Sequence, residues 1–312
     1  MLLILSRFEI WRDDQDTVTV TAREDPSERA GDCRPMESVY PIDQSANRST
    51  RIKRSMNVLV TGGTGALGRE VVIDLRSSGH RARVLSRKAG TGGDWVQGDL
   101  ATGAGLDRAV ADMDAIVHAG TAAAQPWRLR ATDVNGTRRL LEAAKRAHVK
   151  HLVYVSIVGM EGVAFPYYKR KLAAEKIVRE GIVPWSILRA TQFHTLMETF
   201  LGALSRLPRL AAIPFEWKFQ SVDPRDVAAR LTEVVTGEPA GMLTDFGGPE
   251  ILTFEALALT WLKARRLNKR LVNLPLPFKF SRQWAGGHLL CPDHKDGKIT
   301  FEQYLVRKYG RW

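Results

Sequence analysis

A tyrosine and a lysine four positions apart are well suited to move a proton. Tyr167 and Lys171 stand in the run Tyr-Tyr-Lys-Arg-Lys, and on a helix positions i and i+4 share one face. Because an ammonium group favours a nearby phenolate, we expect Lys171 to lower the pKa of Tyr167. Such a phenol can donate or accept a proton at a carbonyl or alcohol carbon. Ser156, at the end of an apolar run, can hydrogen-bond the same oxygen.

This spacing of tyrosine and lysine also arises by chance, so its meaning depends on the elements that position the two residues. A short apolar run from Met56 to Thr61 ends in a glycine-rich turn, and a helical pattern begins at Ala66. Strand, tight turn and helix together suit a dinucleotide pyrophosphate. The helix N-terminus offers unpaired N–H groups to the anion. The predicted contacts are Gly62, Thr64, Gly65, Ala66, Leu67 and Gly68.

Each glycine of this turn has its own expected use. Gly62 can adopt the backbone angles of a sharp turn. Gly65 has no Cβ, so a phosphate can approach the main chain, and Gly68 lets the helix pack close to the strand. A glycine-rich turn without a ligand is the alternative. A phosphate loop of the NTPase kind is disfavoured, because Arg69–Glu70 stand where Lys and Ser/Thr are required.

The end of the second expected strand favours NADP over NAD as the cofactor. Arg81 to Leu85 is followed by Ser86, Arg87 and Lys88. A carboxylate at this position would bind the free 2′-hydroxyl of NAD, but the chain has two cations there. Arg87 can bind a 2′-phosphate through its planar fork, and Lys88 adds a point charge. A solvated basic turn is the alternative interpretation.

The third and fourth expected strands end in residues that can line the same site. Asp99, followed by Leu100, can accept a hydrogen bond from the adenine amino group or can act as a turn residue. Ala119 and Gly120 are small enough for the backbone to lie along the cofactor. His118, just before them, is expected to pack rather than to react.

Hydrophobic periodicity predicts alternating strands and helices. Strands are expected at 56–61, 82–86, 94–97, 114–118, 151–156 and 184–189. Helices are expected at 66–78, 104–111, 129–147, 168–180, 194–206, 223–236 and 253–267, and a closing helix begins near Thr300. This alternation predicts an α/β fold, a doubly wound parallel sheet with helices on both faces.

Three parts of the chain are expected. Residues 1–55 are polar and weakly periodic, and we predict a disordered extension or a start that has been placed too early, with Met56 as the true start. Residues 56–190 form the dinucleotide-binding core. Residues 191–312, which several prolines interrupt, form a smaller substrate lobe packed on the same domain.

Composition limits the partners. The chain has 312 residues, 44% of them hydrophobic, and a net charge of +12. No apolar run approaches the ~20 residues of a membrane span, so we expect no membrane partner. The basic residues are scattered, so a nucleic-acid partner is not expected. Cys33 and Cys291 form no disulfide framework, which favours a reducing cytoplasm.

No metal site is predicted. Asp293–Glu302 has the residue types of a calcium loop, but with Gly297 as the turn glycine the first ligand position falls on a proline. Two histidines near Cys291 lack a fourth ligand with suitable spacing for zinc. Calcium and zinc are therefore both disfavoured.

From Met56 onward the chain resembles the short-chain dehydrogenase/reductase superfamily, and more closely its atypical, NmrA-like branch of NAD(P)-binding proteins. The residues that carry the resemblance are Thr61–Gly68, Gly98–Leu100, Val153–Ser156, Tyr167–Glu175 and Ile187–Phe193. It implies a Rossmann fold and a bound nicotinamide dinucleotide. By position, Ser156, Tyr167 and Lys171 match the superfamily's serine, tyrosine and lysine, and Lys171 can also hold the nicotinamide ribose.

These observations favour an NADP(H)-dependent oxidoreductase that transfers a hydride to or from a small carbonyl, quinone or alcohol. A regulator that senses NADP(H) without turnover, acting through a protein partner, is the first alternative. A nucleotide-sugar epimerase or dehydratase is the second. NAD(H) is the less favoured cofactor, and analogy with the fold alone suggests a homodimer.

Overall fold

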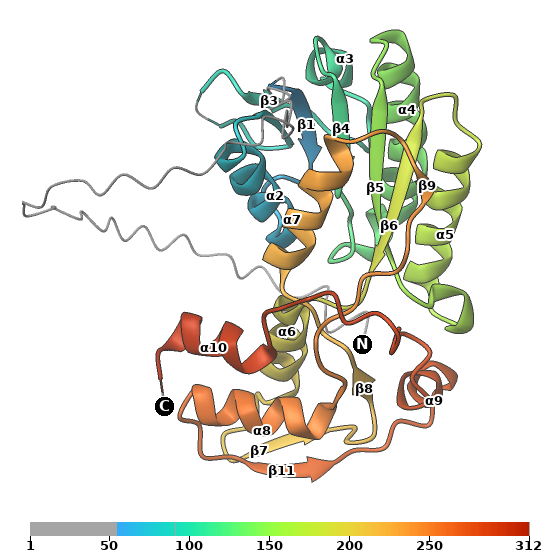
Figure 1. The fold of residues 1–312 in the computed structure, drawn as a ribbon. Coiled ribbons are helices and arrows are strands. Elements are labelled where there is room, and N and C mark those ends of the chain that lie inside the picture. Colours follow the sequence, from blue (N-terminus) through green and yellow to red (C-terminus); the bar gives the residue numbers. More distant parts are fainter. Residues whose placement is uncertain (1–54, 91, 312) are drawn as a thin grey trace, which may run out of the picture. The chain divides into compact units, whose positions relative to one another are not determined.

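The centre of the fold is a parallel sheet of seven strands in the order β3-β2-β1-β4-β5-β6-β9 (Figure 1). A computed structural model describes residues 55–90 and 92–311. The strands are β1 (Asn57–Thr61), β2 (Arg81–Ser86), β3 (Trp95–Gln97), β4 (Ala115–His118), β5 (His151–Ile157), β6 (Trp185–Ala190) and β9 (Gly241–Met242). The strand order reverses between β1 and β4, and open α/β sheets bind ligands at such a point. The predicted parallel sheet is confirmed.

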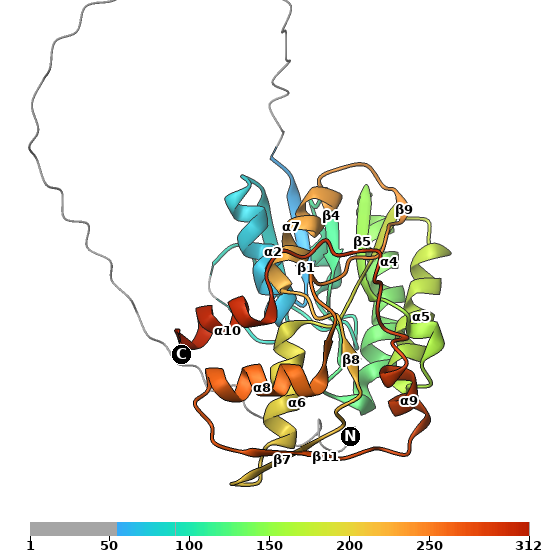
Figure 2. The same ribbon diagram turned by 60° about the horizontal axis from the view of Figure 1, so that its bottom comes forward.

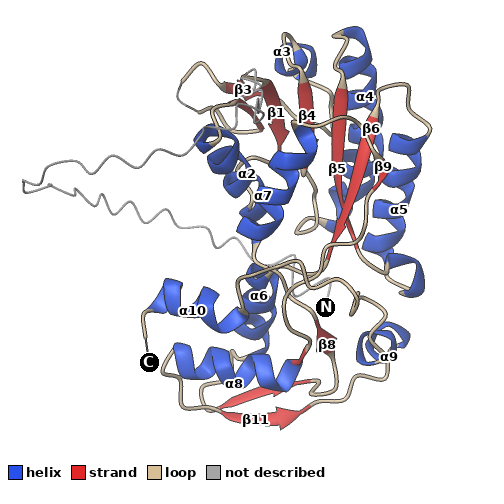
Figure 3. Cartoon of the chain, viewed as in Figure 1, coloured by secondary structure: helices blue, strands red, loops and turns tan. Residues whose placement is uncertain are grey.

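Helices cover both faces of the sheet, as predicted (Figure 3). One face carries α2 (Ala66–Ser77) and α7 (Pro224–Val235). The other carries α3 (Leu106–Val110), α4 (Gly136–Arg146) and α5 (Pro166–Arg179). The residues of β1 alternate between the two cores, with Val58 and Val60 in one and Leu59 in the other. Among the described residues, none of the helices is long and apolar enough to cross a bilayer.

The segment after β6 builds most of a third core, to which Met160, Val163 and Tyr168 from the chain before β6 also belong. Its elements are α6 (His194–Leu204), β7 (Leu210–Ile213), β8 (Lys218–Phe219), β10 (Leu252–Thr253), α8 (Phe254–Ala264), β11 (Arg270–Asn273), α9 (Lys279–Ala285) and α10 (Phe301–Tyr309). Aromatic rings fill this core, and the centroids of Trp217 and Trp284 lie 4.7 Å apart. Trp261 and Leu289 are buried there too, so these residues pack this part of the chain.

The expected division of the chain stays a prediction. The segment after residue 190 also returns to the sheet, since β9 pairs with β6 and α7 packs on the same face as α2. The expected extension over 1–55 lies outside the described residues, apart from Ser55.

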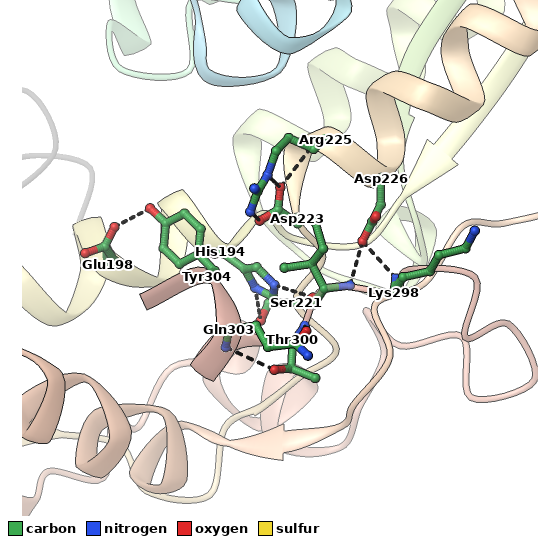
Figure 4. Close-up of polar contacts among 11 residues, drawn as sticks. His194, Glu198, Ser221, Asp223, Arg225, Asp226, Lys298, Thr300, Gln303 and Tyr304 are labelled. Atoms are coloured by element: carbon green, nitrogen blue, oxygen red, sulfur yellow. Dashed lines mark hydrogen bonds and ion pairs between the residues drawn. The ribbon is translucent and has the colours of Figure 1, made fainter. Parts of the chain in front are cut away.

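Hydrogen bonds tie the C-terminal segment to α6 and α7 (Figure 4). His194 Nε2 donates to the carbonyl of Ile299 at 3.0 Å, so Nδ1 accepts from the hydroxyl of Ser221 at 2.9 Å. Asp226 accepts from the backbone N–H groups of Lys298 and Ile299 at 2.8 and 2.9 Å. Burial lowers the pKa of His194, so the imidazole is neutral in this network.

Two helical glycines give opposite expectations for stability. A Cβ on Gly68, in the first turn of α2, would lie 2.1 Å from the carbonyl oxygen of Gly62, whereas a Cβ on Gly202 in α6 would meet open space. We expect Gly68→Ala to lower the free energy of unfolding by about 1–3 kcal/mol through overpacking. Gly202→Ala should raise it by roughly 0.5–1 kcal/mol through helix propensity. Denaturant unfolding measures both, and a Gly68→Ala protein as stable as the wild type would contradict the close contact.

Candidate functional site

The turn between β1 and α2 brings two backbone segments into direct contact. Gly62 has a φ of +71°, and a Cβ on it would lie 2.8 Å from the Cα of Gly120 at the end of β4. The N–H of Gly65 donates to the carbonyl of Gly62 at 2.9 Å and closes the turn. Gly65 is also the N-cap of α2, and no side chain caps that end. The first-turn N–H groups and the positive end of the helix dipole therefore suit an anion.

This turn is one wall of a cavity at the carboxyl edge of β1, β2 and β4. The cavity is lined by Gly62, Thr64, Gly65, Leu85, Ser86, Arg87, Gly98, Asp99, Leu100, Ala119, Gly120, Thr121, Ala122, Ala124, Gln125 and Thr132. Most of the predicted cofactor contacts are in that set. Ala66, Leu67 and Gly68 lie behind the turn in α2, and Lys88 and Lys171 are not among the lining residues.

The two cations after β2 have different surroundings. Arg87 lines the cavity, and its Nη1 donates to Gln125 Oε1 at 3.3 Å. Lys88 makes its described contacts through its backbone, whose carbonyl accepts from Trp95 Nε1 at 2.9 Å. The side chain of Lys88 is exposed, so the structure gives Arg87 the closer relation to the cavity.

Asp99 has two partners at the end of β3. Its Oδ1 accepts from the N–H of Ala101 at 2.9 Å, and its Oδ2 pairs with Arg128 Nη2 at 2.6 Å. Burial opposes ionisation, but these hydrogen bonds and the charge of Arg128 outweigh it, so the pKa of Asp99 lies below its usual value. These are contacts that a turn residue makes, and the adenine contact stays a prediction.

His118 connects the ends of β1 and β4 as a buried neutral imidazole. The hydroxyl of Thr61 accepts from the N–H of Gly120 and therefore donates to His118 Nδ1, at 2.6 Å. His118 Nε2 then donates to Thr137 at 3.0 Å, and the hydroxyl of Thr137 donates to the carbonyl of Asp133. Burial lowers the pKa of His118 to about 3. The expected packing role of His118 agrees with these contacts.

Tyr167 contacts the cavity wall through Thr121. Its hydroxyl oxygen lies 3.5 Å from Thr121 Oγ1, and the hydroxyl of Thr121 donates to Asp133 Oδ1 at 2.5 Å. Burial and the negative charge of Asp133 raise the pKa of Tyr167 above its ordinary value. The expectation that Lys171 lowers this pKa is wrong, because desolvation of the phenol dominates here.

Lys171 turns toward the sheet. Its side chain is 5% exposed, and Nζ donates to the carbonyl of Val155 at 2.7 Å and lies 4.1 Å from the centroid of the Tyr154 ring. Burial lowers the pKa of Lys171 to about 8, although the charges of Asp133 and Glu175 act in the opposite direction.

Ser156, at the carboxyl end of β5, completes the predicted set. Its Oγ is buried without a hydrogen-bond partner among the described residues. Within the described part of the chain, no hydrogen bond joins Ser156, Tyr167 and Lys171 to one another. The fold therefore gathers the three residues around the end of β5 and the start of α5 but leaves them unconnected.

The segment after β4 supplies site residues that the sequence analysis missed. Thr121 and Gln125 line the cavity, Arg128 pairs with Asp99, and Asp133 sits in a π-helical turn, Arg130–Asn135, before α4. The carboxylate of Asp133 also accepts from the N–H of Ala122 at 3.0 Å. Asp133 lies inside the helix expected at 129–147, and the other three residues lie in the segment before it. Their position directly after a strand end that faces the glycine turn was the available signal.

Comparison with known proteins agrees with this site. The family model described as NAD(P)H-binding matches residues 62–236. The (4-alkanoyl-5-oxo-2,5-dihydrofuran-3-yl)methyl phosphate reductase of Streptomyces griseus is 32% identical over 63% of this chain and 69% of its own length. The photosystem II assembly factor Ycf39 of Trieres chinensis is 30% identical over 50% of this chain and 52% of its own.

Solved structures show the same fold. A short-chain dehydrogenase/reductase superfamily protein from Agrobacterium tumefaciens with bound NAD has a TM-score of 0.62 at 24% identity, and the match covers 81% of this chain and 96% of that one. An epimerase from Methanothermobacter thermautotrophicus has a TM-score of 0.69 at 16% identity, covering 82% and 92%. The chain therefore belongs to the NAD(P)H-binding family, and it shares its fold with the short-chain dehydrogenase/reductase superfamily protein.

Proposed function

We propose that this protein is an NADPH-dependent reductase that transfers a hydride to a small carbonyl or quinone. One contact carries the proposal. Thr121 lines the cavity that the glycine turn forms, and the same residue lies 3.5 Å from the hydroxyl of Tyr167. A dinucleotide held by that turn would thus reach toward a phenol that can supply a proton.

The residues present fit a dinucleotide. Gly62 and Gly65 line the cavity, and no side chain caps the start of α2, so a pyrophosphate could reach the first-turn N–H groups there. Arg87 is a cation in the cavity at the end of β2, where NAD-specific proteins use a carboxylate. A planar guanidinium binds a phosphate through two parallel hydrogen bonds, which favours NADP(H).

Tyr167 supplies the proton in the proposed reaction. Tyr167 is protonated at neutral pH, so it donates its proton to the carbonyl oxygen and acts as a general acid. When bound, the reduced nicotinamide supplies a hydride, whose two electrons form the new C–H bond at the carbonyl carbon. Ser156 donates a hydrogen bond to the same oxygen, which becomes the hydroxyl of the alcohol product. The phenolate that remains takes a proton from water before the next turnover.

Two relatives support a reduction. The Streptomyces griseus protein is named as a reductase. The ceramide reductase of Caulobacter vibrioides is 27% identical over 70% of this chain and 74% of its own length. Both names place reductases among the proteins that share this chain's core, and neither gives the substrate of this chain.

A specific observation also favours a second candidate, an NADP(H) sensor without turnover. Lys171 donates to the carbonyl of Val155, and in the described residues it has no hydrogen bond to Tyr167. As a sensor, the protein would bind the dinucleotide in the cavity, and a protein partner would respond to the bound form. Tight NADPH binding without consumption across a panel of carbonyls and quinones would favour the sensor.

Arg87→Gln tests the choice of cofactor. A charge-assisted hydrogen bond contributes roughly 1.5–3 kcal/mol, so NADPH affinity should fall by about 10- to 150-fold. NADH affinity should stay nearly unchanged, because NADH has no 2′-phosphate. Fluorescence titration with both cofactors measures this, and Lys88→Gln is the matched control with a smaller expected effect. Equal loss of both affinities would contradict the role of Arg87.

Tyr167→Phe tests the proton donor. Turnover should fall by about 10²- to 10⁴-fold, because a general acid contributes on that order, while NADPH affinity stays nearly unchanged. Steady-state kinetics and the same titration measure the two quantities. Tyr168→Phe, one position further along α5, removes a hydroxyl from the aromatic core instead and should leave turnover near the wild-type value. Full turnover in Tyr167→Phe would remove Tyr167 from the mechanism.

A further inference from the structure

The small sheet of β7 and β11 has a buried inner face and an outer face of unusual composition. The strands pair in parallel, with Leu210 opposite Arg270 and Ala212 opposite Val272. Ala211 and Ile213 are buried, and Leu271 packs against the aromatic core, so this set forms the inner face. In a strand successive side chains point to opposite faces, and an outer face facing water is normally polar.

The outer face is apolar instead. Leu210 and Val272 lie on it and are both exposed, and Leu274 continues it directly after β11. Leu207, 56% exposed, lies next to this face because Lys269 Nζ donates to its carbonyl at 2.6 Å. Phe278, four residues after Leu274 and directly before α9, is a further exposed apolar side chain of this segment; it is 54% exposed and stacks on Phe280 at 5.6 Å.

Cations surround these side chains. Arg270 lies opposite Leu210 on the outer face, and its N–H donates to the carbonyl of Arg209 at 2.9 Å, which places the exposed Arg209 at the end of the small sheet, directly before Leu210. Lys279 is exposed beside Phe278. We call this surface the basic apolar face. Its members are Leu207, Arg209, Leu210, Arg270, Val272, Leu274, Phe278 and Lys279.

Carboxylates are missing from the segments that build this face. Residues 256–292 contain seven Lys or Arg and no Asp or Glu, and residues 199–215 contain Arg206 and Arg209 and no Asp or Glu. Glu216, in the loop after β7, is the first acidic residue beyond the second segment. In the described residues, none of the ion pairs involves Arg209 or Arg270. The positive charge of this face is therefore available to an anionic partner.

We propose that the basic apolar face docks on an anionic lipid bilayer surface. Exposed leucine, valine and phenylalanine side chains can enter the boundary between headgroups and acyl chains, while arginine and lysine bind the anionic headgroups. Charge complementarity alone would also suit nucleic acid, but contacts with its phosphates would not bury the apolar side chains at the centre of the face. The expectation of no membrane partner came from the lack of a spanning segment, whereas attachment to a surface needs only such a face.

The location of this face suits the proposal. β7 and β11 lie side by side, at the end of their segment that is far from the parallel sheet (Figures 1 and 2). The cavity at the ends of β1, β2 and β4 has none of these residues in its lining. Docking would therefore leave the cavity free, and the inference does not depend on the proposed reductase activity.

Co-sedimentation of the full chain with lipid vesicles tests the proposal. Vesicles of equal parts phosphatidylcholine and phosphatidylglycerol should bind the protein, and pure phosphatidylcholine vesicles should bind it weakly. Arg209→Glu with Arg270→Glu should lower the partition coefficient by roughly 30-fold or more, since each lost charge contributes about fivefold. Leu207→Ser with Phe278→Ser should lower it at least about tenfold. NADPH affinity should stay unchanged in both variants.

Matched controls place equal changes elsewhere on the surface. Ile73→Ser with Ile182→Ser removes two side chains that are 61% and 72% exposed, and Arg138→Glu with Lys145→Glu reverses two exposed charges on α4. Both controls should bind vesicles like the wild type. The proposal is overturned if the wild type does not bind anionic vesicles, or if the two controls lose as much vesicle binding as the variants of the basic apolar face. It is also overturned if the protein binds duplex DNA instead of vesicles and the Leu207→Ser, Phe278→Ser protein keeps that DNA binding.

Discussion

The backbone contact between Gly62 and Gly120 is the constraint on which the rest of the site depends. A side chain at Gly62 would collide with the end of β4, and the positive φ of Gly62 turns the chain from β1 into α2 at that point. Because Gly68 has no Cβ, the first turn of α2 can pack against the carbonyl oxygen of Gly62. The hydrogen bonds from Thr61 to His118 and from Gly120 to Thr61 hold the two strand ends in this contact. The cavity opens where the strand order reverses, because the turn leaves that edge clear.

Burial, rather than charge attraction, sets the protonation state of the candidate chemical groups. Tyr167 has a raised pKa because its phenol is desolvated and faces Asp133. Lys171 has a pKa lowered to about 8 by burial, despite the nearby charges of Asp133 and Glu175. Where desolvation exceeds the Coulomb interaction, both groups shift toward their neutral forms. A neutral phenol has the protonation state that a general acid needs.

Much of the fold could be predicted from the sequence because the signals are local. Short apolar runs and 3.6-residue periodicity identified β1 to β6 and the helices of both faces, and the glycine run located the turn. β9 was not predicted, because a strand of two residues has too short a pattern. The exposed outer face of β7 and β11 was not predicted either, because apolar side chains in a sequence indicate a buried core. Asp133 lies in a π-helical turn inside an expected helix, and the bond from Lys171 to Val155 depends on packing between α5 and β5. Such contacts are set by tertiary packing, which sequence spacing does not contain.

The most direct test of the central claim follows the hydride itself. The purified protein would be incubated with NADPH that carries deuterium at the reactive C4 position and with a panel of aldehydes, ketones and quinones. Mass spectrometry would then locate deuterium in the products. The account predicts an alcohol with one deuterium on the former carbonyl carbon, or for a quinone substrate, consumption of NADPH in step with hydroquinone formation. Tight binding of NADPH with no reduced product from any member of the panel would contradict the reductase and leave the sensor.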